Sequence, residues 1–188
     1  MEWITRLDAG TLLFIQDTIR NPVLTPVFMA ITVLGNGAAI WILISLGMAA
    51  SGKTRGTALM CAVALLASLL INNMALKNIV GRIRPYDAIE GLIPRIGKPR
   101  DYSFPSGHTG SSFAAAWVLY RRLPKRLGIP ALALAGLIGI SRLYLGVHYP
   151  TDVLFGMLSG IGSGCIAIAI VSALMRKRGH GGIEESGQ

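Results

Sequence analysis

The sequence predicts an all-α membrane protein with a single domain over residues 1–188. Hydrophobic residues make up 52% of the chain and charged residues only 14%, whereas soluble domains average about 25% charged residues. The apolar residues gather in long runs, as a helix that spans a bilayer requires roughly 17–25 of them. Lys and Arg stand mainly between these runs, so the net charge of +9 indicates membrane topology and not a nucleic-acid partner.

Residues 1–20 are expected to form an amphipathic helix. One helical face carries Ile4, Leu7, Thr11, Ile15 and Ile19, with charged residues interspersed. Such a helix can lie in the membrane interface with its apolar face in lipid. It can also pack on the helical bundle, and the pattern fits both placements. We take the interfacial placement as the prediction.

Residues 21–175 are expected to form the transmembrane bundle, but hydropathy leaves its first part open. Val23–Ala50 is almost wholly apolar and uncharged, and Gly35-Asn36-Gly37 interrupts it. It can be one long span or two short helices joined by a turn. Thr57–Leu76 then forms a span of its own.

The second half continues with a long loop and three further spans. The loop, Lys77–Phe104, is long for a compact protein, which is typical of functional segments. The spans are Ser106–Tyr120, Leu127–Leu145 and Thr151–Met175. Glycines recur every four residues in the last span, at Gly156, Gly160 and Gly164. Small residues at this spacing predict close packing inside the bundle, and the tail, residues 176–188, is expected to be disordered.

The stretch Ser141–Asp152 reads S-R-L-Y-L-G-V-H-Y-P-T-D and joins two apolar runs. Charged residues in such a place are costly unless they are used. Asp152 stands four residues after His148, and a carboxylate beside an imidazole can fix its tautomer and stabilise its cation. Arg142 offers a fork of donors for phosphate or carboxylate. A structural ion pair at a helix end would show the same pattern.

Two upstream motifs decide between these interpretations. Lys77–Pro85 reads K-N-I-V-G-R-I-R-P and Phe104–Thr109 reads F-P-S-G-H-T. With Ser141–Asp152 they give K-x6-R-P, P-S-G-H and S-R-x5-H-x3-D, in this order. The trio resembles the signature of the type-2 phosphatidic acid phosphatase superfamily of membrane lipid phosphatases. The resemblance implies six transmembrane helices, and therefore two helices in Val23–Ala50.

The resemblance also implies roles for the motif residues. Lys77, Arg84 and Arg142 would bind the phosphate, together with the backbone N–H groups of Ser106 and Gly107 at a helix start. His148, oriented by Asp152, would be the catalytic nucleophile that forms a phosphohistidine. His108 would be the catalytic general acid and then general base.

Other polar residues are assigned less directly. No Asp, Glu and His cluster with ligand spacing occurs, and the two cysteines, Cys61 and Cys165, lie inside apolar runs. We therefore predict no metal and no cofactor. Asn72 and Asn73 are expected near the mouth of the site. Arg82, Arg100 and His180 are placed outside it, the first two on a solvated face of the loop.

Under a six-span count the basic stretches at 51–56, 121–126 and 176–178 share one side of the membrane. The positive-inside rule makes that side cytoplasmic and puts the site on the outer face of the inner (plasma) membrane. The expected partners are membrane lipids and a lipid phosphate substrate. Undecaprenyl diphosphate is favoured, with phosphatidylglycerol phosphate and phosphatidic acid as alternatives. A small transporter, a vanadate-dependent haloperoxidase and an inactive lipid-binding relative are the rival interpretations.

Overall fold

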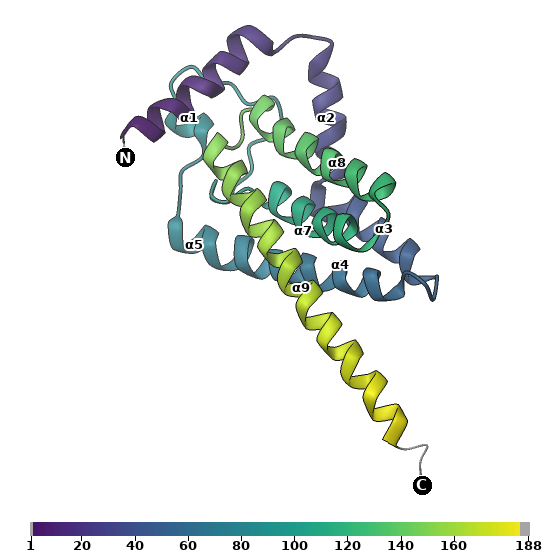
Figure 1. The fold of residues 1–188 in the computed structure, drawn as a ribbon. Coiled ribbons are helices and arrows are strands. Elements are labelled where there is room, and N and C mark those ends of the chain that lie inside the picture. The colour runs from purple at the N-terminus through teal and green to yellow at the C-terminus, as the bar shows by residue number, and fades with distance from the viewer. Residues whose placement is uncertain (1, 185–188) are drawn as a thin grey trace.

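The computed structural model describes the backbone of residues 2–184 and the side chains of residues 3–177. Within these residues every regular element is helical, which confirms the all-α prediction (Figure 1). The elements are, in order, α1 (Glu2–Phe14), η1 (Ile15–Ile19), α2 (Leu24–Leu34), η2 (Asn36–Ala38), α3 (Ala39–Ala49), α4 (Arg55–Ser68), η3 (Leu69–Leu76), α5 (Lys77–Val80), α6 (Pro85–Ala88), α7 (Gly107–Arg122), α8 (Lys125–Tyr144) and α9 (Pro150–Glu184).

Three helical segments within the described residues are long and apolar enough to cross a membrane. They are Lys125–Tyr144, Pro150–Lys177 and Arg55–Ala88, the last of which includes the non-helical residues 81–84. A fourth crossing is possible where Leu24–Leu34 and Asn36–Ala49 form a pair bent by 50°. The prediction of six spans is therefore not confirmed by helix length and composition.

The bend between α2 and α3 falls at the predicted Gly35-Asn36-Gly37 turn. Gly37 (φ 54°) and Ala38 (φ 59°) both adopt the left-handed conformation, which ends the helix and redirects the chain. Each helix has 11 residues and is therefore about 16 Å long. Because the hydrocarbon core is about 30 Å thick, neither helix crosses it alone.

The centre of the bundle is α7, which packs against α4, α8 and α9 (Figure 1). Small residues allow these helices to approach closely, as predicted for the glycines of α9. A Cβ atom at Gly156 would lie 2.7 Å from the carbonyl oxygen of Ser106, and one at Gly160 would overlap the carbonyl oxygen of Gly110. A Cβ at Gly164 would lie 3.0 Å from the carbonyl oxygen of Ala114.

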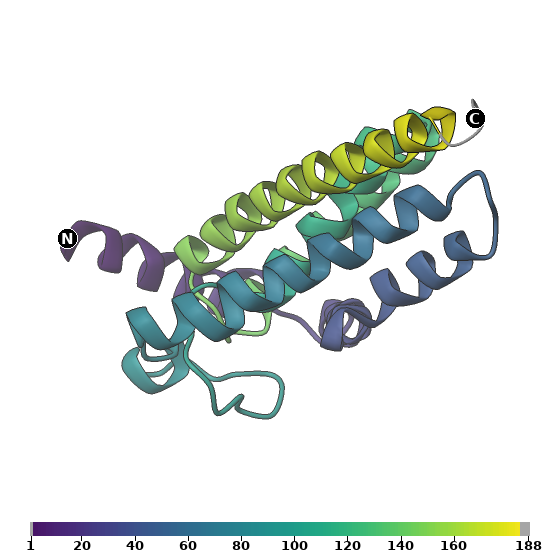
Figure 2. The ribbon, with the colours of Figure 1, turned by 90° about the horizontal axis from the view of Figure 1, so that it is seen from below.

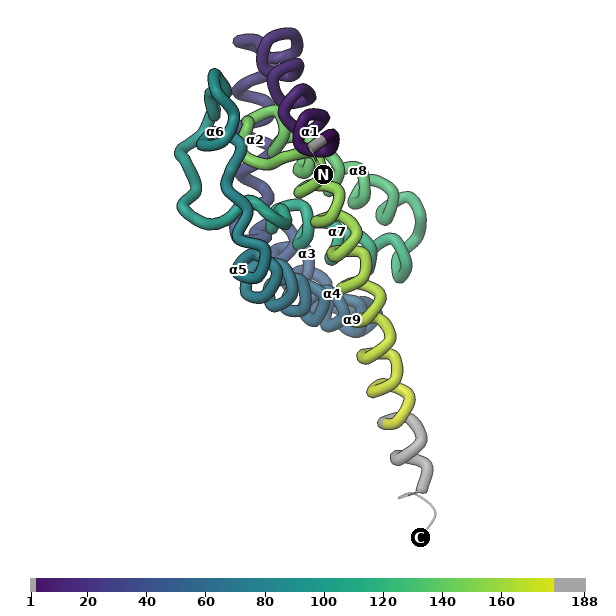
Figure 3. Tube along the Cα trace, turned by 90° about the vertical axis from the view of Figure 1, so that its left-hand side faces the viewer, coloured from purple at the N-terminus to yellow at the C-terminus, as the bar shows by residue number. Residues whose placement is uncertain are grey.

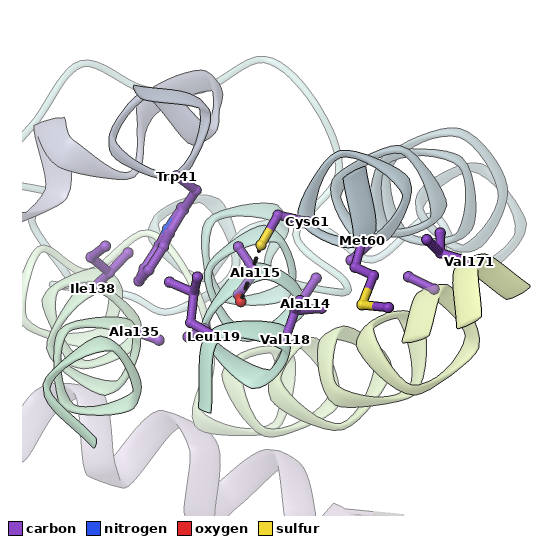
Figure 4. Packing of buried hydrophobic residues seen from close by; sticks show 13 residues of the cluster. Trp41, Met60, Cys61, Ala114, Ala115, Val118, Leu119, Ala135, Ile138 and Val171 are labelled. Atoms are coloured by element: carbon purple, nitrogen blue, oxygen red, sulfur yellow. Dashed lines mark hydrogen bonds between the residues drawn. The ribbon is translucent and has the colours of Figure 1, made fainter. Parts of the chain in front are cut away.

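The apolar core lies along the C-terminal half of α7 (Figure 4). Trp41 of α3 is fully buried against it, and its indole N–H donates to the hydroxyl of Ser112 at 2.9 Å. Aliphatic side chains from α4, α8 and α9 fill the remainder. This core holds α3 and α4 on α7 and so fixes the helices that carry the polar end of the bundle.

The predicted loop Lys77–Phe104 begins later than expected. The α4 helix continues through the π-helical turn η3 into α5, so Lys77 lies on a helix and not in a loop. The helix ends at Gly81, where φ is 58° and a residue without Cβ is favoured. The chain then leaves the bundle near α6 and returns to the start of α7 (Figure 3). One backbone hydrogen bond, from Ser103 N–H to Arg82 O at 2.8 Å, ties its two ends together.

The N-terminal helix α1 packs on the bundle at the end where α9 begins (Figure 2). Asp8 and Leu12 are buried, with exposed fractions of 2% and 0%. Trp3, Leu7 and Phe14 are exposed on the other side of α1. Of the two placements considered for this helix, packing on the bundle is therefore observed, while contact of its apolar side with lipid stays a prediction.

The last helix extends past the point where a disordered tail was predicted. The backbone of residues 176–184 continues α9, since each residue added to an existing helix contributes a hydrogen bond without a new nucleation step. Residues 185–188, the end of the predicted tail, lie outside the described residues.

The close contact of α7 and α9 makes Gly160 sensitive to substitution. We expect Gly160→Ala to destabilise the protein by roughly 1–3 kcal/mol, because the added methyl group overpacks against backbone that cannot move aside. Gly162→Ala is the matched control, since a Cβ there has nothing within 4 Å. The measurement is the thermal unfolding midpoint in detergent. Equal midpoints for the two variants would contradict the packing argument.

Candidate active site

A cavity of about 380 Å³ lies at the polar end of the bundle. Its wall combines the end of the α4–α5 helix, the start of α7, the end of α8 and the α2–α3 bend. The predicted site residues that line it are Lys77, Arg84, Gly107, His108, Arg142 and His148. Three motifs that are far apart in sequence therefore meet in one cavity.

His148 lies in the turn between α8 and α9 and is buried, with an exposed fraction of 1%. Its Nε2 lies 3.4 Å from an Arg84 guanidinium nitrogen, and its Nδ1 lies 3.5 Å from Oδ2 of Asp152. Burial lowers the pKa of His148 to about 4, although Asp152 acts in the opposite direction. The imidazole is therefore neutral at pH 7, as a nitrogen nucleophile requires.

Asp152 is fully buried behind His148 and does not line the cavity. Its Oδ2 accepts hydrogen bonds from the Ser103 hydroxyl and from Tyr149 N–H, the latter at 2.9 Å. Its Oδ1 accepts a hydrogen bond of 2.6 Å from Arg82. The carboxylate that faces His148 is thus held on both oxygens, which fixes the electrostatics behind the imidazole.

Lys77 and Arg84 share one carboxylate, that of Asp101. Nζ of Lys77 donates to Oδ2, and Arg84 donates to Oδ1 at 2.6 Å and to the Asp101 carbonyl at 2.8 Å. Burial raises the pKa of Asp101, but Lys77 and Arg84 outweigh it and lower this pKa to about 2. The Asp101 carboxylate is therefore charged, and it is bound to both Lys77 and Arg84 in this structure.

Arg142 is the third cation of the cavity, with an exposed fraction of 3%. One guanidinium nitrogen donates to the Thr32 hydroxyl of α2 at 2.5 Å. Its Nε has no hydrogen-bond partner among the described residues, although it is buried. A buried cation with an unused donor is suited to an anionic ligand.

Ser106 and Gly107 differ in their placement at the start of α7. Ser106 is the N-cap, because its hydroxyl accepts from the Thr109 hydroxyl at 2.9 Å and, at 3.4 Å, from the Thr109 backbone N–H. Its own N–H donates to the Asp152 carbonyl at 3.0 Å, so it is not directed at the cavity as predicted. Gly107 does line the cavity, and Asn73 packs where its Cβ would be.

His108 lines the same cavity as His148. Its Nε2 lies 2.9 Å from the amide oxygen of Asn36, in the α2–α3 bend. A Cβ at Gly35 would lie 2.9 Å from the His108 ring, so the bend must approach this closely without a side chain. The glycine-containing turn thus has a second use, which is to hold the candidate acid.

Several polar residues of the site were not predicted. Asp8, Asn36, Asp101 and Ser103 stand outside the three motifs and carry no signal of their own in one sequence. Arg82 lies inside K-x6-R-P, and the observed ion pairs correct its assignment to a solvated face. Asn73 lines the cavity as expected, while Asn72 is buried beside it. Among the described residues, no group of three or more His, Cys, Asp or Glu side chains could hold a metal ion.

Comparisons with known proteins place this geometry in a family. The model of the PAP2 superfamily matches residues 57–176. Phosphatidylglycerophosphatase B of Bacillus subtilis is 36% identical over 156 residues, which are 76% of this chain and 73% of the relative. An undecaprenyl-diphosphatase of Sulfolobus acidocaldarius is 28% identical over 133 residues, and the match covers 71% of this chain but only 64% of that protein.

The fold agrees with that of a solved structure as well. The crystal structure of LpxE from Aquifex aeolicus superimposes with a TM-score of 0.78 at 26% identity, over 87% of this chain and 95% of that chain. The matched family region contains all three motifs and most of the residues that line the cavity, while Gly35, Gly37, Ala38 and Ile42 of the lining precede it. The chain therefore belongs to the PAP2 superfamily, the type-2 phosphatidic acid phosphatase superfamily of membrane phosphatases.

Proposed function

We propose that the chain removes a phosphoryl group from a lipid phosphate or diphosphate through a phosphohistidine at His148. One observation carries this proposal: the buried imidazole of His148 shares a cavity with the cations Lys77, Arg84 and Arg142. Phosphoryl transfer spreads negative charge over three oxygens, so fixed cations around the phosphorus supply most of the catalysis. Each such donor is worth roughly 100–1000-fold in rate.

In the first step Nε2 of His148 attacks phosphorus, and the bond from phosphorus to the leaving oxygen breaks. His108, which takes up a proton from solvent when the anionic phosphate is bound, donates this proton to that oxygen, which belongs to the lipid alcohol or, for a diphosphate, to the lipid monophosphate. Asp152 stabilises the imidazolium that forms. Water then attacks phosphorus, His108 takes its proton, and cleavage of the phosphorus–nitrogen bond releases inorganic phosphate and neutral His148.

The apolar part of the cavity supports a lipid substrate. Four aliphatic residues of α3, α4 and η3 line it, namely Ile42, Leu65, Leu66 and Leu69. Two of these, Ile42 and Leu65, also line a groove of about 830 Å³ along α3 and α4. A chain attached to a phosphate in the cavity could follow this groove. The names of the two relatives favour undecaprenyl diphosphate and phosphatidylglycerol phosphate as substrates, and we propose the former, with phosphatidic acid as a third candidate.

The site is proposed to face outward from the plasma membrane, with five crossings and not six. Asp8 of α1 accepts a hydrogen bond of 3.1 Å from Thr151 N–H, so α1 lies at the site end of the bundle. The bent pair α2–α3 then links this end to the basic stretch 51–56 in one crossing. With α4, α8, α9 and the shorter α7, whose 16 residues lie at the centre of the bundle, this makes five, and it leaves all three basic stretches on the cytoplasmic side.

Replacing His148 tests the reaction directly. Purified protein in detergent should release inorganic phosphate from at least one of the three candidate lipids. His148→Ala should lower this release by at least about 1000-fold, because no other group forms the covalent intermediate. Acid-labile phosphate from labelled substrate should be trapped on wild-type protein and be absent from the variant. Residual activity within about tenfold of wild type would refute the nucleophile, and absence of phosphate release by wild type would favour a transporter.

Replacing Asp101 tests whether its carboxylate competes with the substrate phosphate. Asp101→Asn removes the anion from Lys77 and Arg84 and keeps the shape of the side chain, so KM should fall several-fold while kcat changes little. Because its pKa is lowered to about 2, the carboxylate stays charged down to about pH 4. The competition should therefore not vary between about pH 5 and 8. A higher KM in the variant would mean that Asp101 positions the cations.

Cysteine labelling tests the orientation. In a background without Cys61 and Cys165, an impermeant thiol reagent on intact cells should label Lys98→Cys and spare Arg122→Cys. The opposite pattern would put the site in the cytoplasm. The number of crossings is read from Thr5→Cys, at an exposed position of α1. Five crossings predict that it is labelled with Lys98→Cys, whereas six predict that it is protected.

A further inference from the structure

We propose that Arg82 is a positioning residue for the reaction, held in place by the N-terminal helix. It fixes the Asp152 carboxylate behind His148, and Asp8 of α1 fixes Arg82 in turn. This inference rests on the proposed function, because it assigns a role in the same chemistry. It makes α1, which lies outside the matched family region, a part of the catalytic structure.

The contacts of Arg82 form a bridge between two buried carboxylates. One guanidinium nitrogen donates to Oδ1 of Asp152 at 2.6 Å and to the Thr151 hydroxyl at 2.7 Å. The other donates to Oδ2 of Asp8 at 2.7 Å. The side-chain exposure is 24% for Arg82, 2% for Asp8 and 0% for Asp152. The guanidinium also lies over the Tyr149 ring, 3.8 Å from its centroid, which limits its movement.

Two arginines of the segment G-R-I-R hold the His148–Asp152 pair from opposite ends. Arg84 lies 3.4 Å from Nε2 of His148, on the cavity side. Arg82 binds the far oxygen of Asp152 and does not line the cavity. Asp152 Oδ2 is 3.5 Å from Nδ1 of His148, so a small rotation of the carboxylate would change its alignment with the imidazole. Arg82 restricts that rotation.

The charge balance requires this arginine. Asp8 and Asp152 are both buried, and Arg82 is bonded to each of them. Removal of one partner of a buried ionic group leaves charge uncompensated and is strongly unfavourable. A lysine keeps the charge but cannot reach both carboxylates with a planar fork. Asp8 should therefore matter to catalysis through Arg82, although it touches no substrate.

Asp8 also docks α1 on the start of α9. Its Oδ1 accepts from Thr151 N–H at 3.1 Å and its Oδ2 from the Thr151 hydroxyl at 2.5 Å. It therefore caps the first turn of α9, the helix that carries Asp152, from outside that helix. The same carboxylate thus orders both Arg82 and the backbone next to Asp152, which links the position of α1 to the geometry of the site.

The test uses the full-length protein in detergent with the preferred lipid phosphate. Arg82→Gln should lower kcat by roughly 10–100-fold and leave KM within about threefold, because Arg82 lies behind the pair and not in the cavity. Arg82→Lys should recover part of the lost rate. Arg100→Gln is the matched control from the same loop, at an exposed position, and should keep wild-type kcat. Phosphohistidine formation in a single turnover should slow in parallel with kcat.

Asp8→Asn provides the second, independent variant. It should slow phosphohistidine formation, and in the double variant with Arg82→Gln the two losses should not multiply, since both act on one network. An Arg82→Gln enzyme with wild-type kcat overturns the inference when His148→Ala is inactive. So does a rise in KM alone. If Arg82→Gln does not fold, the double variant of Arg82→Lys with Asp8→Asn is measured instead. A loss of kcat equal to the product of the two single losses would overturn the inference. Absence of phosphate release by wild type overturns the proposed function, and this inference with it.

Discussion

The burial of three cations in one cavity is the constraint on which the polar end of this bundle depends. Lys77, Arg84 and Arg142 have exposed fractions of 7%, 5% and 3%. Desolvated charge is stable only with partners, and the surrounding elements supply them: the Val147 carbonyl, the Thr32 hydroxyl and the Asp101 carboxylate. Each partner comes from a different segment, so the long loop, α2 and the α8–α9 turn all converge on the site. The arrangement of these segments is therefore tied to the contacts that the three cations require.

Asp101 makes such a site stable before any substrate arrives. Its carboxylate satisfies Lys77 and Arg84 together, yet its side chain is 52% exposed, which leaves it able to move aside. A phosphate that enters the cavity would replace the Asp101 carboxylate on Lys77 and Arg84. The two buried cations would therefore keep an anionic partner throughout. Arg142 keeps a buried donor without a partner among the described residues. The charges of Lys77 and Arg84 are therefore compensated by Asp101 before the substrate binds, and do not depend on the substrate.

The sequence predicted the residues that touch the cavity better than those that hold them. Six of the eight predicted site residues line the cavity, whereas Ser106 and Asp152 lie outside its lining. For Ser106, the sequence could not distinguish a role as helix N-cap from a role in binding the phosphate. The supporting residues Asp8, Asn36 and Ser103 act through single contacts across 49–143 positions of sequence. Such contacts follow from the packing and leave no periodic pattern.

The arrangement of crossings shows the same division between local pattern and tertiary contact. The turn-forming residues Gly35-Asn36-Gly37, and not hydropathy, indicated the break correctly, because left-handed backbone at 37 and 38 redirects the chain locally. Whether α2 and α3 form one crossing or two depends on the side of the membrane on which α1 lies. A 20-residue amphipathic pattern is compatible with either side. In the structure α1 is held at the site end by Asp8, which binds the start of α9, and by Leu12, which is buried against Leu92 and Tyr149. These tertiary contacts, which the amphipathic pattern does not specify, place the N-terminal helix beside the site.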